Sequence, residues 1–104
     1  MNSALNRMAI FVLAASVVTP AFAQNNGADI YKAKCAMCHG ATGTPSPAMA
    51  KAMGIKPVSD PSMKALTIAQ IEATVKNGHG KMKPIAGLSD AQVSAVAAYF
   101  KTLK

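Results

Sequence analysis

The chain has 104 residues but no tryptophan, 5% aromatic residues, four acidic residues and a single arginine. So few aromatic side chains provide no platform on which nucleic-acid bases stack, and no nucleic-acid-binding motif is present. Valine-rich segments that alternate apolar and polar residues are also absent, and no pattern resembles a βαβ unit. The apolar residues recur with helical spacing instead. We therefore expect an all-α protein that does not bind nucleic acid.

No apolar run is long enough to span a bilayer. The longest, Met8 to Val18, has the length of the apolar region of a signal peptide. It follows Arg7 in a segment without acidic residues, and Ala21-Phe22-Ala23 supplies a small-x-small cleavage pattern. We predict that residues 1–23 are a secretory signal peptide cleaved after Ala23, with an uncleaved membrane anchor as the alternative. The mature protein is then exported, without stable membrane insertion.

The remaining residues, 24–104, form one small domain whose apolar core alone would be marginal. They contain ten lysines and four acidic residues, so their net charge is about +6. Such a charge steers a protein towards an anionic partner, at a rate that falls with salt. For an exported protein we favour an acidic docking face on a partner protein over an anionic membrane surface. Charge that serves solubility alone is the third interpretation.

The residues that carry chemistry are concentrated in Cys35-Ala36-Met37-Cys38-His39. C-x-x-C-H is the attachment signature of c-type haem. Two thiols three positions apart on one helical turn reach the two vinyl groups of one porphyrin edge and form thioethers. The adjacent His39 then supplies an imidazole to the iron. We predict one covalent haem c, tethered by Cys35 and Cys38, with His39 as an axial ligand.

The two cysteines allow three other interpretations. A thioredoxin-like redox pair belongs near a βαβ pattern, which this chain lacks. A zinc site would combine Cys35, Cys38 and His39 with His79, but the second histidine is isolated and far downstream. A disulfide between the two cysteines closes so small a loop that it stabilises little.

Local signals divide the domain into three helical segments separated by loops. Thr67 with Gln70 and Ser89 with Gln92 have the spacing of capping boxes. Helices are therefore predicted for Gly27 to about Cys35, Thr67 to about Asn77, and from Ser89 onward. Apolar residues share one face of the second segment (Ile68, Ile71, Val75) and of the third (Val93, Val96, Ala97, Phe100). The prolines of residues 40–61 allow only a short turn at Ala48–Met53.

These motifs together resemble the small class I c-type cytochromes, the single-haem electron carriers of bacterial periplasms. The likeness rests on GADIYKAKCAMCHG, on KNGHGKMKPIAGLSDAQVSAVAAYFKTL and on the proline-containing loop between them. It implies three main helices with Pro/Gly-rich loops wrapped around one covalent haem. It also implies that the terminal helices cross, with Gly27 and Tyr31 opposite Val96 and Tyr99. The expected function is single-electron transfer in the periplasm, without substrate turnover, by a monomer.

The second axial ligand is expected to be Met82. It lies in a glycine-rich loop and is followed shortly by Pro84, where the family has its distal methionine. Met37 lies inside the attachment turn and cannot reach the opposite haem face, while Met49, Met53 and Met63 are expected to fill the core. His79 is the alternative ligand, because Lys83 separates Met82 from Pro84 whereas many relatives have Met directly followed by Pro. A thioether favours ferrous iron and closes it to substrates, which favours electron transfer.

A ligating histidine usually donates its other ring N–H to an acceptor that fixes its orientation. In the family a proline carbonyl in the loop after the attachment motif accepts this bond. Pro47 matches that position best, and Pro45 is the alternative. Other functions stay open: a haem subunit of a larger oxidoreductase, an exported thiol–disulfide oxidoreductase that uses the two cysteines, or a haem enzyme or sensor with a labile distal ligand.

Overall fold

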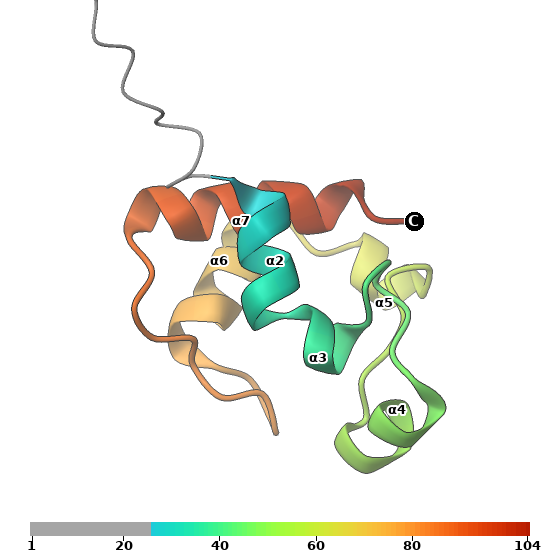
Figure 1. Cartoon of the computed structure of the whole chain (residues 1–104). Coiled ribbons are helices and arrows are strands. Elements are labelled where there is room, and N and C mark those ends of the chain that lie inside the picture. The colour runs from blue at the N-terminus through green and yellow to red at the C-terminus, as the bar shows by residue number, and fades with distance from the viewer. Residues whose placement is uncertain (1–25) are drawn as a thin grey trace, which may run out of the picture.

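The computed structural model describes residues 26–104, which form six α-helices joined by loops (Figure 1). The predicted signal peptide, residues 1–23, and its cleavage point lie outside these residues. Within the described residues there is no strand, only an isolated bridge between His79 and Met82, so the all-α prediction is confirmed. The helices are α2 (Gly27–Lys34), α3 (Ala36–His39), α4 (Pro47–Met53), α5 (Pro61–Lys64), α6 (Ile68–Asn77) and α7 (Asp90–Thr102).

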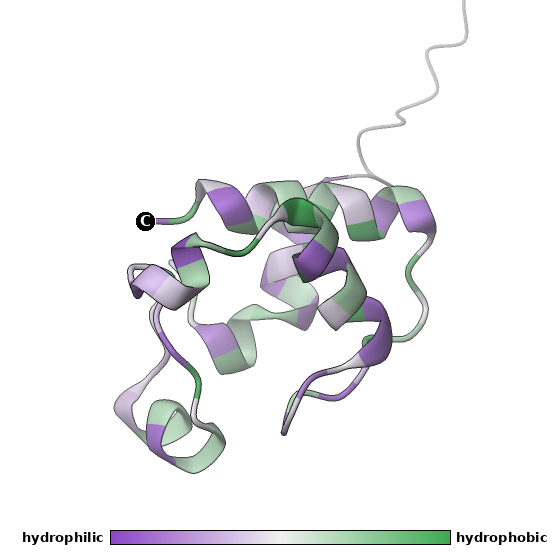
Figure 2. Ribbon diagram, turned by 180° about the vertical axis from the view of Figure 1, so that it is seen from behind, coloured by the Kyte–Doolittle hydropathy of each residue, from purple (hydrophilic) through white to green (hydrophobic). Residues whose placement is uncertain are grey.

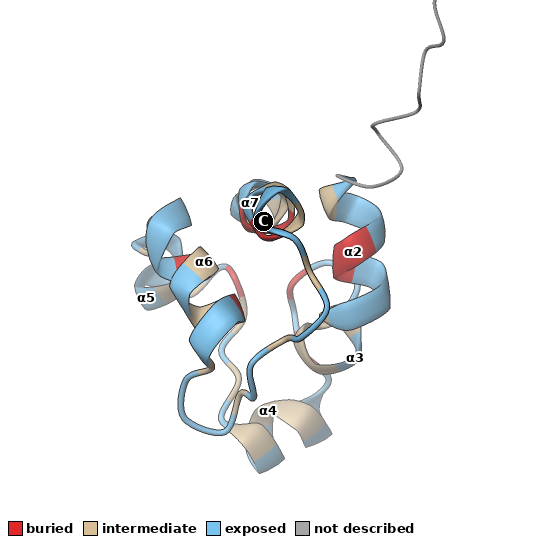
Figure 3. Cartoon of the chain, turned by 90° about the vertical axis from the view of Figure 1, so that its left-hand side faces the viewer, coloured by how far each residue is buried: buried red, intermediate tan, exposed pale blue. Residues whose placement is uncertain are grey.

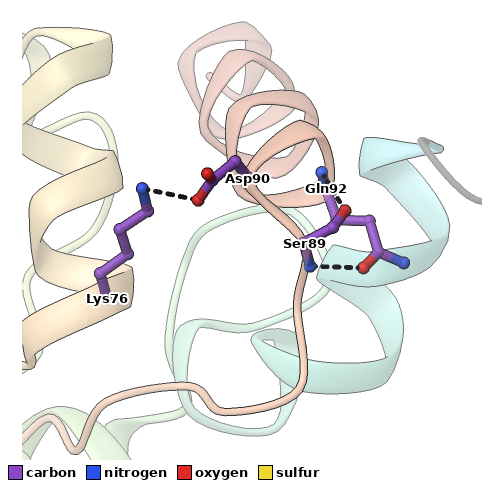
Figure 4. A network of polar contacts seen from close by, with 4 residues as sticks. All are labelled: Lys76, Ser89, Asp90 and Gln92. Atoms are coloured by element: carbon purple, nitrogen blue, oxygen red, sulfur yellow. Dashed lines mark hydrogen bonds and ion pairs between the residues drawn. The ribbon is translucent and has the colours of Figure 1, made fainter.

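Both predicted capping boxes are present. Thr67 caps α6 and Ser89 caps α7, and each side chain accepts a hydrogen bond from the backbone amide of the glutamine three residues later. Each glutamine side chain in turn accepts from the capping residue's own amide, as Figure 4 shows for Ser89 and Gln92. A cap of this kind is worth about 1 kcal/mol of helix stability. These two helices therefore begin where local chemistry satisfies their first amides.

The crossing of the terminal helices occurs as the resemblance implied. Tyr31 of α2 is buried with Ile30 against Val96 of α7, and the Tyr31 ring centroid lies 5.5 Å from that of Tyr99. Gly27 permits this approach, because a Cβ atom there would clash with the Ala95 carbonyl and lie 2.8 Å from the Tyr99 Cβ. Figure 1 shows α2 running across α7 at this point.

A second apolar cluster joins α6 to the other side of α7. Its buried residues are Ile71, Val75, Val93 and Ala97. Figure 3 shows α7 between the two flanks, with α2 and α3 on one side and α5 and α6 on the other. Helices α2 and α6 each pack on α7. Helix α7 is thus the element common to both clusters.

One residue predicted on the buried face of α6 is not buried. Ile68 is 42% exposed, whereas Ile71 and Val75 are buried as expected. Ile68 is the first residue of α6, and the residues of this face that pack on α7 are Ile71 and Val75, further along the helix. On α7 the predicted stripe is confirmed, with Val93, Val96 and Ala97 buried and Phe100 packed against both clusters.

The proline-rich middle of the chain contains two short helices. Helix α4 confirms the predicted turn and begins one residue earlier, at Pro47, with Ser46 as its cap. Helix α5 was not predicted, although Asp60 caps it and Pro61 is its first residue, a combination typical of helix starts. Figure 2 shows α4 coloured largely hydrophobic, yet none of its residues is buried. Over the part of the chain described, no helix combines the length and apolar character needed to cross a membrane.

Candidate haem-binding site

The attachment motif forms its own single turn directly after α2. Cys35 ends α2 and precedes α3, and its carbonyl accepts hydrogen bonds from the amides of Cys38, at 3.2 Å, and His39, at 2.9 Å. Both cysteines are free and half-buried, and Cys35 packs against the cluster that joins α2 to α7. The side chain of Met37 is 88% exposed. The turn therefore keeps its two thiols partly sheltered and turns its methionine to solvent.

His39 is also half-buried, and its ring centroid lies 5.7 Å from that of Phe100, edge to face. Burial lowers the pKa of the His39 imidazole, so its neutral form is favoured. The neutral ring is the form that coordinates a metal. His39 is thus held, in the protonation state of a ligand, beneath the C-terminal half of α7.

The Cys35 thiol does not have the lowered pKa of a reactive thiol. Burial raises the pKa of the Cys35 thiol, and the neighbouring Cys38 raises it further. Reactive C-x-x-C cysteines instead have a lowered pKa, which supplies the nucleophilic thiolate. The raised pKa of Cys35 therefore gives no support to the thiol–disulfide interpretation. The zinc interpretation gains no support either, since residues 26–104 contain no metal-ligating group of three or more His, Cys, Asp or Glu side chains.

Tyr31 fixes the chain immediately after the motif. Its hydroxyl donates a hydrogen bond of 2.6 Å to the carbonyl of Gly40. Gly40 has a φ of 82°, which favours glycine and lets the chain turn away from His39. Burial is the main cause that raises the pKa of Tyr31 from 10 to about 12, and Cys35 adds to it. The hydroxyl thus stays protonated and available as a donor across the physiological range.

Replacing Tyr31 with phenylalanine is expected to lower the free energy of unfolding by about 1 kcal/mol, because the Gly40 carbonyl loses its donor. Below pH 10 the two proteins should differ in their free energy of unfolding by this whole amount. The difference should shrink as the pH rises from 10 towards 12, because the unfolded phenol then ionises while the folded one keeps its proton. Urea unfolding of both proteins at several pH values checks this. A difference that grows with alkaline pH would contradict it.

Met82 lies on the other flank, in a tight hairpin after α6. The His79 and Met82 amides each donate 2.9 Å hydrogen bonds to the other's carbonyl, with Gly80 and Lys81 at the turn. Gly78 must be glycine here, because its φ is 78° and a Cβ would lie 2.7 Å from the Met82 carbonyl oxygen. Met82 is half-buried, whereas His79 is exposed. Residues directly opposite in such a pair project to the same face, so the hairpin alone does not separate the two candidates; burial favours Met82.

The hairpin is anchored at two points. The Ile85 amide donates a 2.9 Å hydrogen bond to the carbonyl of Val75 in α6, and the Ile85 side chain packs against the cluster between α6 and α7. On the other side, the ammonium group of Lys81 donates a 2.9 Å hydrogen bond to the carbonyl of Ala52 in α4. Met82 is therefore attached to the α6 flank, while His39 belongs to the α2 flank.

The residues present fit a haem c. The donors are two free thiols, a neutral imidazole and a thioether, which is the set that c-type haem uses. Among residues 26–104 no polar or charged side chain is buried. Several apolar side chains near the two flanks are only partly buried: Leu66, Ile85, Leu88 and Phe100. An apolar group bound between the flanks would shield these side chains from solvent. The apolar helix α4, which has no buried residue, could then pack against that group.

The two candidate prolines differ in position. Pro47 is exposed as the first residue of α4, whereas Pro45 is buried. Pro45 lies in a loop held by a hydrogen bond of 2.9 Å from the Val58 amide to the Gly43 carbonyl. Burial thus distinguishes Pro45 from the residue that the resemblance placed first.

Three contacts at this site were not predicted from the sequence: Tyr31 with Gly40, His39 with Phe100, and Lys81 with Ala52. Tyr31 and Phe100 carried a partial signal, since both belong to predicted apolar faces. Lys81 carried none, because its partner lies 29 residues away. A lysine in a loop is otherwise indistinguishable from one that is simply solvated.

Comparison with known structures identified c-type cytochromes. The cytochrome KustC0563 shares 22% identity, with a TM-score of 0.65 over 76% of this chain and 98% of that one. A Tyr-to-Phe mutant of the same cytochrome shares 20% identity, with a TM-score of 0.63 over 76% of this chain and 99% of that one. A chain of the Kuenenia stuttgartiensis reducing HAO-like protein complex Kustc0457/Kustc0458 shares 23% identity, with a TM-score of 0.53. The match covers 73% of this chain and 40% of that one. At these identities the likeness shows a shared fold.

Among curated protein sequences no significant match was found. A family model described as cytochrome c oxidase, cbb3-type, subunit III matches residues 22–100, which is most of the chain. This span includes the attachment motif, the Met82 hairpin and both apolar clusters. The protein belongs to this family of c-type cytochromes, whose function is haem-based electron transfer.

Proposed function

We propose that this cytochrome carries single electrons in the periplasm through one covalent haem c, with Cys35 and Cys38 as its tethers. His39 and Met82 are the proposed axial ligands. The observation that carries the proposal is the placement of these groups. The C-x-x-C-H turn lies on the α2 flank and the half-buried Met82 on the α6 flank of the same helix, α7.

When bound, haem supplies an iron that takes up and releases one electron. His39 offers its neutral ring to that iron, and Met82 offers a thioether that favours the ferrous state. Two protein ligands leave no open position for a substrate, which supports a carrier over an enzyme or sensor. We also propose that a proline carbonyl orients the His39 ring. Its burial makes Pro45 the better candidate, and Pro47 the alternative.

The proposal is tested by optical spectra of the protein produced with a haem-maturation system. Acid–acetone extraction should leave the haem on the polypeptide, because thioethers resist it. The ferric spectrum should show the weak far-red band of a sulfur–iron bond. Covalent haem without that band would instead favour His79 or an open iron. Loss of all haem from the polypeptide, with a control cytochrome correctly matured, would contradict the attachment through Cys35 and Cys38.

A subunit role in a larger oxidoreductase is the second candidate. The matching family model is described as an oxidase subunit, and a neighbour of similar fold belongs to a protein complex. Size-exclusion chromatography of the natural periplasmic fraction, followed at the haem absorbance, distinguishes a free carrier from a subunit. A free carrier elutes at the size of a single small domain, and a dedicated subunit elutes with its complex.

The proposed partner offers an acidic docking face. Residues 35–59 and 73–89 contain no Asp or Glu, and they include the attachment motif and the Met82 hairpin. The hydrogen bond from Lys81 to Ala52 brings these two segments together. Lys51, Lys56 and Lys83 are exposed on them. We propose that this acid-free surface faces the partner.

Reversing two charges on this surface should slow electron transfer at an anionic surface about ten-fold at low salt. The variant is Lys51→Glu with Lys83→Glu, and the probe is a gold electrode coated with a carboxylate-terminated thiol monolayer. The matched control is Lys32→Glu with Lys104→Glu, which has the same net charge but lies outside the two acid-free segments. Equal slowing in both variants would mean that net charge, and not this surface, governs docking.

A further inference from the structure

Helix α4 has little support from the rest of the fold. None of its residues is buried, and it does not pack against another helix as α2 and α6 pack against α7. Its side chains include Met49 and Met53, so it is apolar as well as unsupported. Something other than helix packing must therefore hold it in place.

Lys81 provides such a contact. Its ammonium group donates a 2.9 Å hydrogen bond to the carbonyl of Ala52, in the last turn of α4. Carbonyls in the last turn of a helix lack intrahelical partners and form its negative end, which attracts a cation. The amide of Gly54 satisfies the carbonyl of Ala50, and Lys81 serves the carbonyl of Ala52. The contact therefore combines a hydrogen bond with a favourable charge interaction.

The position of Lys81 links this contact directly to Met82. Lys81 is one of only two residues between the paired His79 and Met82, so the turn leaves little freedom between the lysine and the methionine. Without this bond, the hairpin's described hydrogen bonds to the rest of the fold come from its α6 side, through Ile85. The tip that carries Met82 would then be held from one side only.

We propose that Lys81 is a positioning residue for the Met82 thioether. By bonding to the end of α4, it holds the hairpin from its second side and keeps Met82 directed at the interior. This inference rests on the proposed ligation by Met82. Lys81 and the neighbouring Lys83 are both exposed, but of the two only Lys81 has a hydrogen-bond partner among the described residues.

The test compares three holoprotein variants: Lys81→Ala, Lys83→Ala and Lys81→Arg. The two alanine variants remove the same charge on either side of Met82, so they correct for the general effect of charge near the iron. The arginine variant keeps a donor that reaches the Ala52 carbonyl. The main readout is the rate at which imidazole binds to the ferric protein, because this requires the hairpin to open. The thermal loss of the far-red band and the global unfolding midpoint are followed in parallel.

We expect imidazole to bind about five-fold faster to Lys81→Ala than to Lys83→Ala, the factor that corresponds to one hydrogen bond of ordinary net strength. The far-red band should be lost at a lower temperature, and Lys81→Arg should restore both. Equal rates in the two alanine variants, with the band intact in the unmodified protein, would overturn the positioning role alone. Absence of the band from the unmodified protein would overturn ligation by Met82, and this inference with it.

Discussion

Replacing Met82 with alanine is expected to abolish the far-red ferric band and to open the iron to added cyanide or carbon monoxide. Covalent haem content should change little, because Cys35 and Cys38 lie on the opposite flank from the hairpin. The alanine side chain offers no donor atom, and His79 is exposed whereas Met82 is half-buried. The measurement is a pair of ferric and ferrous spectra with and without the added ligands.

Two further variants make this result specific. Met53→Ala removes a half-buried methionine from α4 and should leave the band unchanged. The double variant Met82→Ala with His79→Ala shows whether the histidine replaces the methionine. Iron that stays closed in the single variant and opens only in the double one would assign His79 as the substitute ligand. Unchanged spectra in both would contradict any role of the hairpin in ligation.

Introducing valine at Gly27 is expected to have the largest effect on stability. Its Cβ would clash with the carbonyl of Ala95 and lie 2.8 Å from the Cβ of Tyr99, so α2 and α7 would have to separate. Overpacking of this kind costs about 3 kcal/mol, out of a total stability of about 5–15 kcal/mol for a typical domain. The thermal unfolding midpoint of the holoprotein should fall accordingly, with a reduced yield of folded protein.

The matched control is Ala28→Val, in the same turn of α2. Ala28 is exposed, so the added methyl groups meet solvent rather than α7. This variant should differ from the unmodified protein by only the modest helix propensity of valine. If the two valine variants had equal midpoints, the close approach of the terminal helices at Gly27 would not be a determinant of stability.

Local chemistry made much of this fold predictable. The capping boxes at Thr67 and Ser89 fixed the starts of α6 and α7, because their partners lie three residues away in sequence. Pro47 and Pro61 are each the first residue of a helix, yet only the first of these helices was predicted. Helix α5 has only four residues and no apolar periodicity, so its start signal stood alone.

Contacts between distant segments were beyond prediction from one sequence. Ile68 fits the apolar spacing of α6, but its exposure depends on where α7 crosses. The choice between Pro45 and Pro47 depends on which proline the loop buries, and the spacing after the motif is compatible with both. The proposed haem ligands come from the motif and the resemblance. Their placement on two sides of α7 depends on contacts between distant segments, which one sequence does not reveal.

The position of α7 in both apolar clusters has a consequence for the order of assembly. Val96 belongs to one cluster, and Val93 and Ala97 belong to the other, so neither cluster can be completed before α7 has been made. The thiols of Cys35 and Cys38 come more than fifty residues earlier. In a growing chain the attachment motif is therefore present before either apolar cluster can be complete. Completion of both apolar clusters is left to the thirteen-residue helix α7.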